Sequence, residues 1–169
     1  MATTAGDATV NQFTAALEEL DVGWTLTTTD ELPGELERFP EPIVGVPFPF
    51  EDVSLPESIP RAERSDGVKA ASTGVTAATL GIVEYGSVVV ESKPPETEPV
   101  SLYADTHVAV VRLEDIVDSM SDAFAELGPR LRETGGNAII ATGPSATADM
   151  GALVRGVHGP SDVHVVIVK

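Results

Sequence analysis

The stretch NAIIATGPSATAD, residues 137–149, has the pattern of a buried strand that runs into a tight turn. Residues 138–141 form a short apolar run, and Gly143-Pro144 interrupts it. Further on, the sequence GVHGP at residues 156–160 breaks the chain again, and the apolar sequence VHVVIV at residues 163–168 indicates a closing strand. The C-terminal third is therefore expected to be a strand–turn–helix–turn–strand unit with polar turns.

The segment after Gly143-Pro144 has the residues of a helix N-terminus. Ser145, Thr147 and Asp149 are residue types that cap helices, so we expect a helix from this cluster to about Val154. A helix N-terminus presents free backbone N–H groups and the positive end of a dipole, which can hold an anion. Ser145 and Thr147 could bind such a ligand or only cap the helix, and one residue can serve both purposes.

Other candidate binding residues lie in the turns of the chain. In open α/β sheets, ligands bind beyond the carboxyl ends of the strands, which directs attention to the turns near Thr73-Gly74, after Thr142, and at residues 156–160. His158, beside Gly159, could act as a general acid or base, or could be a loop histidine bonded to the backbone. The histidines are too far apart in the sequence to suggest a metal site, and we expect none.

The rest of the chain alternates between strand and helix patterns. Residues 7–20 have the apolar spacing of an amphipathic helix, residues 24–28 indicate a short strand, and residues 29–62 are rich in proline and are expected to wrap the core as loops. The remaining expected elements are strands at residues 68–75, 87–91 and 107–111, a helix at residues 77–85, a loop at residues 92–99, and a long helix from Leu113 to about Gly128-Pro129.

This alternation predicts an α/β fold with a mostly parallel sheet and helices on both faces. A length of 169 residues favours one domain overall. Within it, we expect residues 1–65 to form an N-terminal helix and a Pro-rich acidic segment that pack on an α/β core of residues 66–169.

Composition limits the classes of function. The formal net charge of −17 argues against binding to nucleic acid or to an anionic membrane. With no cysteine, the chain has no thiolate nucleophile and no ligand for a cysteine-bound iron–sulfur cluster. The N-terminus lacks the basic and apolar parts of a signal peptide, and no apolar run is long enough to span a bilayer, so we expect a cytoplasmic protein.

The acid-rich and lysine-poor composition is typical of proteins that work in molar salt. We therefore predict a halophilic source and a folded state that loosens in dilute buffer, where the carboxylates repel one another. Thermal melts in dilute buffer and in molar KCl test this prediction, and equal melting temperatures would contradict it.

The C-terminal motifs resemble a known family. The sequence GPSATAD at residues 143–149, followed by LVRGVHGP at 153–160 and by VHVVI at 163–167, is similar to the C-terminal signature of the LUD-domain family, and most closely to its lactate-utilisation protein C (YkgG-like) group. The sequences TGVT at 73–76 and GIVEYGSVVV at 81–90 resemble an earlier block of that family. The chain departs from the family at Ala146, where a basic residue is frequent.

The resemblance implies a fold of the NagB/RpiA/CoA-transferase-like type and a role in oxidising lactate to pyruvate alongside iron–sulfur partner proteins. On this view the chain is a subunit that has no redox centre or cofactor of its own and binds a small organic anion or its partners. The alternatives are a stand-alone enzyme or binding protein for a phosphorylated, folate or CoA-type ligand, and a scaffold. The candidate ligand-binding residues are Thr73, Gly74, Gly143, Ser145, Thr147, Asp149, His158 and Gly159.

Overall fold

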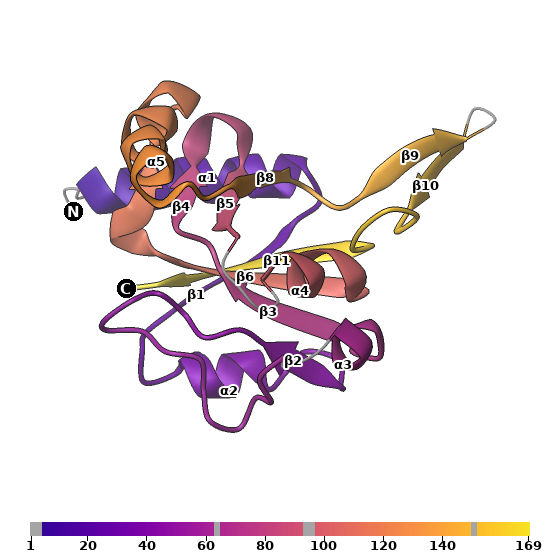
Figure 1. Ribbon diagram of the computed structural model, residues 1–169. Helices are drawn as coiled ribbons and strands as arrows, with labels where there is room; N and C mark the ends of the chain where they lie inside the picture. The colour runs from indigo at the N-terminus through magenta and orange to yellow at the C-terminus, as the bar shows by residue number, and fades with distance from the viewer. Residues whose placement is uncertain (1–4, 63–64, 93–96, 150–151) are drawn as a thin grey trace.

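A five-stranded parallel sheet forms the centre of the molecule (Figure 1). The computed structural model describes residues 5–62, 65–92, 97–149 and 152–169. The strands of the central sheet lie in the order β1 (Gly23–Thr27), β11 (Asp162–Val168), β6 (Thr106–Arg112), β3 (Thr73–Ala77) and β2 (Ile43–Gly45), and every adjacent pair is parallel. This architecture confirms the α/β prediction.

Helices cover both faces of this sheet because its strands are apolar on both sides. Ala109 and Val111 of β6 face α1 (Ala5–Glu19), which contributes the buried Phe13 and Leu17. The intervening residues of β6 face the opposite side, where α2 (Leu32–Leu36) and apolar residues of the loops before residue 62 pack. A strand buried on both faces has this continuous apolar pattern. None of the described helices is long and apolar enough to cross a membrane.

A second, four-stranded sheet lies over the α1 side of the central sheet (Figure 1). Its order is β7 (Ile116–Val117), β4 (Leu80–Ile82), β5 (Ser87–Glu91) and β8 (Ala138–Thr142), with β5 antiparallel to both neighbours. One face contributes Val88 and Ala141 to the core shared with β6 and β11, and the other packs against α5 (Met120–Thr134). The strand expected at residues 138–141 is therefore confirmed, as a member of this smaller sheet.

The prediction of a helix at residues 77–85 is wrong. This segment contains β4 and the short 3-10 helix η1 (Val83–Tyr85), and Gly86 closes it with a left-handed φ of 59°. All residues from Ala77 to Ile82 are buried, since the segment passes from the central sheet into the second one. A continuous apolar run suits a buried strand as well as a buried helix, and local periodicity does not separate the two.

Three other boundaries differ from the prediction. The expected strand at 68–75 begins only at Thr73, and α3 (Ser65–Lys69) precedes it. The expected loop at 92–99 contains the start of α4 (Thr97–Tyr103), while residues 93–96 lie outside the described residues. The long helix does not start at Leu113, because η2 (Leu113–Asp115) and β7 lie there. α5 starts after its N-cap Ser119 and continues past Gly128-Pro129 to Thr134, with Gly135 as its C-cap.

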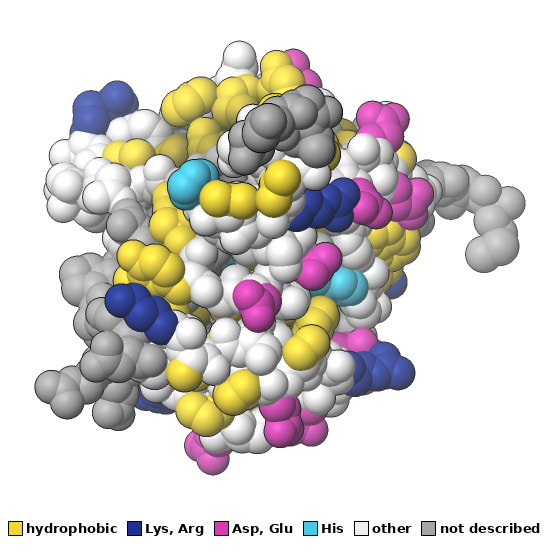
Figure 2. Space-filling view, turned by 90° about the vertical axis from the view of Figure 1, so that its right-hand side faces the viewer, with side chains coloured by type: hydrophobic (Ala, Val, Ile, Leu, Met, Phe, Trp, Pro, Cys, Tyr) yellow, Lys and Arg dark blue, Asp and Glu magenta, His cyan; other side chains and the backbone are white. Residues whose placement is uncertain are grey.

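The prediction of a helix after Gly143-Pro144 is also wrong, because the segment forms a β-hairpin. β9 (Ala146–Asp149) pairs antiparallel with β10 (Ala152–Arg155), and the hairpin projects from the body (Figure 1). Inter-strand pairing satisfies the backbone there, and the apolar residues do not form a helical stripe. On the face that carries the hairpin, apolar and acidic side chains are mixed (Figure 2). The side chain of Leu153 in the hairpin is 69% exposed. The proposed anion site at a helix N-terminus therefore does not exist.

Candidate functional site

The root of the hairpin brings the two Gly-Pro turns together. The backbone N–H of Ser145 donates to the carbonyl of Pro160 at 2.9 Å, and the N–H of Gly156 donates to the carbonyl of Ser145 at 3.0 Å. A Cβ on Gly159 would lie 3.0 Å from the Cβ of Ser145, which is closer than an ordinary van der Waals contact. Glycine, which has no side chain, therefore allows the two turns to approach one another. Gly143 has a φ of +73°, which favours glycine. These turns are thus joined although the whole hairpin separates them in sequence.

Behind this junction lies a cavity of about 190 Å³, which we call the inter-sheet pocket. It lies between the central sheet and the second sheet, with α4 and the two turns at its side. The residues that line it are Val90, Ser101, Leu102, His107, Ile139, Ala141, Gly143, Ser145, His158, Gly159, Pro160 and Val163.

The pocket lies at the amino ends of the central parallel strands, and not at their carboxyl ends as expected. His107 and Val163 are the second residues of β6 and β11, and they are adjacent in register. The carboxyl end of β8 reaches the same place, since Gly143 follows Thr142. β8 belongs to the second sheet, so its direction is independent of the rule for the central parallel strands.

The polar side chains of the pocket differ in burial. His107 is only 2% exposed, and its Nε2 shares a hydrogen bond of 2.9 Å with the Thr76 hydroxyl. Burial lowers the pKa of His107 from 6.5 to about 4, so the imidazole is neutral at pH 7. Ser145 is half-buried and His158 is exposed. Among the described residues, neither the Ser145 hydroxyl nor the His158 imidazole has a hydrogen-bond partner, so both can bind a ligand.

The other candidate residues do not line the pocket. The hydroxyl of Thr73 donates to the carbonyl of Pro40 at 2.7 Å, and Gly74 packs so closely on α4 that a Cβ would lie 2.2 Å from the carbonyl oxygen of Val100. Thr147 lies opposite Val154 in the hairpin. Asp149 is the last residue of β9, and its side chain lies outside the described part of the chain.

Comparison with known proteins gives the family. The model of the LUD domain matches residues 35–168, which is most of the chain. The chain belongs to the LUD-domain family. A protein named lactate utilization protein C from Deinococcus radiodurans is 27% identical over 94% of this LUD domain, and proteins of the same name from Bacillus licheniformis and Bacillus subtilis are 34% and 32% identical over 67%.

The matched region spans 79% of the Deinococcus relative but only 46% of each Bacillus relative. The fold also resembles the crystal structure of a DUF162 family protein from Deinococcus radiodurans. The TM-score is 0.74 at 20% sequence identity, with 98% of this LUD domain and 99% of the other chain covered. At this identity the likeness shows the fold alone.

Sequence reasoning missed His107 and Ser101 as pocket residues of this LUD domain. His107 is the only ionisable side chain in the apolar run at residues 107–111, and that conflict is the signal that could have identified it. His164 and Arg155 do not line the pocket, and both have partners in the structure. Thr25 and the Nε2 of His164 share a hydrogen bond of 2.8 Å, and Arg155 pairs with Asp21 at 2.7 Å. Arg155 is therefore neutralised by a surface acid.

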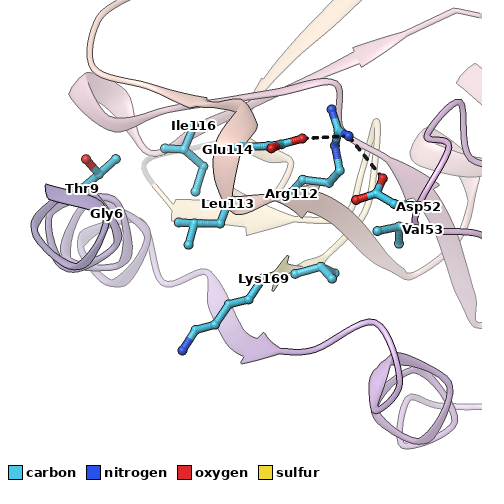
Figure 3. Close-up of a pocket in the computed structure, with 10 residues that line it drawn as sticks. Gly6, Thr9, Asp52, Val53, Arg112, Leu113, Glu114, Ile116 and Lys169 are labelled. Carbon is cyan, nitrogen blue, oxygen red and sulfur yellow. Dashed lines mark hydrogen bonds and ion pairs between the residues drawn. The ribbon is translucent and has the colours of Figure 1, made fainter. Parts of the chain in front are cut away.

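A larger cavity of about 410 Å³ lies at the carboxyl ends of β6 and β11, where the sequence predicted no turn of interest (Figure 3). Its walls are largely apolar, and the charged residues that line it are Asp52, Arg112, Glu114 and Lys169. The guanidinium binds Asp115 through Nε at 2.6 Å and contacts Asp52 and Glu114 through Nη1 at 3.2 and 2.9 Å. Because three carboxylates already surround Arg112, its guanidinium is poorly suited to bind an anionic ligand. The two Gly-Pro turns line the smaller inter-sheet pocket, and we prefer that pocket as the candidate site.

The buried His107 predicts a loss of stability in acid. The unfolded chain binds a proton at this imidazole below pH 6.5, whereas the folded protein does so only near pH 4. Stability is therefore complete above pH 6.5 and falls as the pH drops toward 4, by about 3 kcal/mol in total. Urea denaturation in molar KCl at pH 7 and pH 4 measures the loss.

The variant His107→Gln keeps a group that can bond to Thr76 but does not titrate, so its acid loss is expected to be about 3 kcal/mol smaller than that of the native protein. Carboxylates also titrate in this range, and comparing the two proteins cancels their contribution. His158→Gln serves as the control, because it replaces an exposed histidine of the same pocket. Equal acid losses in the native protein and His107→Gln would contradict the prediction.

Proposed function

We propose that this LUD domain takes part in lactate utilisation and binds a small organic acid in the inter-sheet pocket. The observation that carries the proposal is the junction of the two Gly-Pro turns. It places at one cavity the side chains of Ser145 and His158, which have no hydrogen-bond partner within the described part of the chain. The relatives named lactate utilization protein C suggest the metabolic context. The family signature and the cavity thus coincide in space.

The size of the pocket supports a small ligand. An apolar cavity of about 150 Å³ in an engineered protein binds benzene. Lactate has as many non-hydrogen atoms as benzene, so the volume of about 190 Å³ suits a three-carbon acid. A nucleotide, a folate or a CoA ester is several times larger and could enter only in part. The pocket therefore favours lactate or a similar acid over the ligands of the alternative hypothesis.

The pocket can bind a carboxylate through hydrogen bonds at its open end. Ser145 can donate its hydroxyl hydrogen, and the imidazole of the exposed His158 can donate an N–H. Among the described residues, no lysine or arginine lines the cavity, so we place the carboxylate near the solvent-exposed rim, where desolvation costs less. The apolar walls deeper in the cavity then surround the carbon chain of the acid.

The proposed role in the oxidation of lactate is that of a subunit without a redox centre. The chain has no cysteine, so cysteine-bound iron–sulfur clusters would belong to partner proteins that accept the electrons. Purification of the native protein from its source cells in molar KCl, followed by mass spectrometry, tests this part of the proposal. Co-purification of cysteine-rich, iron-containing proteins is expected. Recovery of the chain alone under these conditions would contradict it.

The binding proposal predicts that Ser145→Ala weakens the affinity for L-lactate about fivefold, which corresponds to the loss of one hydrogen bond. Isothermal titration calorimetry in molar KCl measures the dissociation constant. Thr147→Ala is a matched control, because Thr147 lies in the same segment but on the hairpin outside the pocket. Equal weakening by both substitutions, or no binding of lactate to the native protein, would overturn the proposal.

A further inference from the structure

The inter-sheet pocket contains a polar atom at its buried end that the proposed carboxylate contacts do not use. His107 is more than nine-tenths buried and lines the cavity. Its Nε2 is bonded to Thr76, and its Nδ1 has no hydrogen-bond partner among the described residues. This nitrogen is not among the described side-chain atoms that are both fully buried and unpaired, so it is open to the cavity and can bond to a group that enters there.

We propose that His107 makes the pocket selective for a 2-hydroxy acid over the same acid without the hydroxyl group. This inference rests on the proposed function, and it assigns the second polar group of the ligand. The carboxylate lies at the rim with Ser145 and His158, while the hydroxyl reaches the Nδ1 of His107 at the buried end.

The chemistry of the two partners is complementary. A neutral imidazole nitrogen is a donor or an acceptor according to the tautomer, and a hydroxyl group can act as either. The hydroxyl therefore pairs with Nδ1 in both tautomers. The hydrogen bond between Thr76 and Nε2 fixes the ring, so Nδ1 is held in one position at little further cost in entropy. The apolar residues Val90, Ile139 and Val163 surround the rest of the ligand.

Discrimination arises because an acid without the hydroxyl group leaves Nδ1 unpaired. In solution, water can bond to this nitrogen, and a bound acid displaces that water. Propionate, which is lactate without its hydroxyl group, has no atom that can form a hydrogen bond with Nδ1 in place of this water. Leaving a buried polar group unsatisfied reduces the affinity by roughly 10-fold or more.

The test is calorimetric titration of the full chain in molar KCl with L-lactate and with propionate. The native protein is expected to bind L-lactate at least about 10-fold more tightly than propionate. In His107→Leu the two affinities are expected to become nearly equal, through loss of lactate affinity and retention of propionate affinity. Ser145→Ala is expected to weaken both acids by the same factor and to leave their ratio unchanged, because Ser145 contacts the shared carboxylate.

The outcomes separate this inference from the proposed function. If neither acid binds the native protein, both fail. Suppose that both acids bind and that Ser145→Ala weakens both. If the native protein then binds the two acids equally, or if His107→Leu keeps the native preference for L-lactate over propionate, only the role of His107 is overturned.

A measurement on the native protein covers the case in which His107→Leu does not fold. The nitrogen NMR signal of His107 Nδ1 should shift on addition of L-lactate and not on addition of propionate. A shift with neither acid, or an equal shift with both, overturns the inference. The chain has only three histidines, so His158→Gln and a corresponding variant at His164 suffice to assign the signal.

Discussion

Gly74→Ala is expected to lower the free energy of unfolding by about 3 kcal/mol, because the added methyl group has no room. A Cβ at this position would lie 2.2 Å from the carbonyl oxygen of Val100 and 3.2 Å from the Cβ of Ala104. The first of these atoms belongs to the backbone of α4, so a side-chain rotation cannot relieve the clash. The helix would have to move away from β3, and both elements contribute to the core.

Urea denaturation of the variant in molar KCl measures this loss. Gly34→Ala is the control, since no atom lies within 4 Å of a Cβ at that position in α2. Alanine favours the helix over glycine, so the control is expected to be as stable as the native protein or more stable by up to about 1 kcal/mol. A Gly74→Ala protein of native stability that no longer binds a ligand would instead place Gly74 at the binding site, as the sequence prediction had it.

Phe13→Ala is expected to cost about 3–5 kcal/mol, which is typical for removing a fully buried phenylalanine. The side chain of Phe13 is 0% exposed and is part of the core that α1 shares with both sheets. A Cβ on Gly81 of β4 would lie 3.1 Å from the Cζ of Phe13, which shows how closely the ring packs on the second sheet. The substitution leaves a cavity between α1 and the two sheets.

Phe124→Ala provides a matched control, because Phe124 lies on the helix α5 but is 56% exposed. We expect this variant to lose less than about 1 kcal/mol. Thermal and urea denaturation of the two variants measures the difference. Equal losses would mean that the ring of Phe13 does not hold α1 against the sheets as the structure describes.

The strong local patterns predicted much of the secondary structure. The helix at residues 7–20 follows from the spacing of Val10, Phe13 and Leu17, and the strands β6, β8 and β11 follow from apolar runs bounded by turns. Where a run is apolar throughout, as at residues 77–82, the sequence alone does not distinguish a buried strand from a buried helix. The error at residues 77–85 has this origin.

The error after Gly143-Pro144 has a different origin. Ser145, Thr147 and Asp149 have side chains that bond to the nearby backbone at helix caps and equally in turns and loops. Residues 146–149 and 152–155 are each too short to form a stable helix alone, and pairing with one another satisfies their backbone groups. Whether this segment forms a helix or a hairpin therefore depends on the partner strand, and local sequence signals do not identify that strand.

Some of the residues named from the sequence line the candidate pocket, and others lie elsewhere. The turns that contain Gly143 and Gly159 were recognised from their residues and from the family signature, and the structure places both at the inter-sheet pocket. Thr73 and Gly74 have the same kind of turn signal, but they hold β3 against Pro40 and α4. A glycine in a turn can accommodate a ligand or a neighbouring helix, and only the neighbouring atoms in space separate these two cases.

The sequence by itself determined the α/β class, the position of the principal strands and the membership of the LUD-domain family, because each depends on residues that are close together in the chain. Tertiary structure alone decided that a second sheet covers the first and that a pocket lies between them. It also brought His107 from the start of a central strand to the turn residues Ser145 and His158. The physical reason is that such a pocket requires contacts between distant segments, and those contacts follow from how the sheets pack and not from any local pattern.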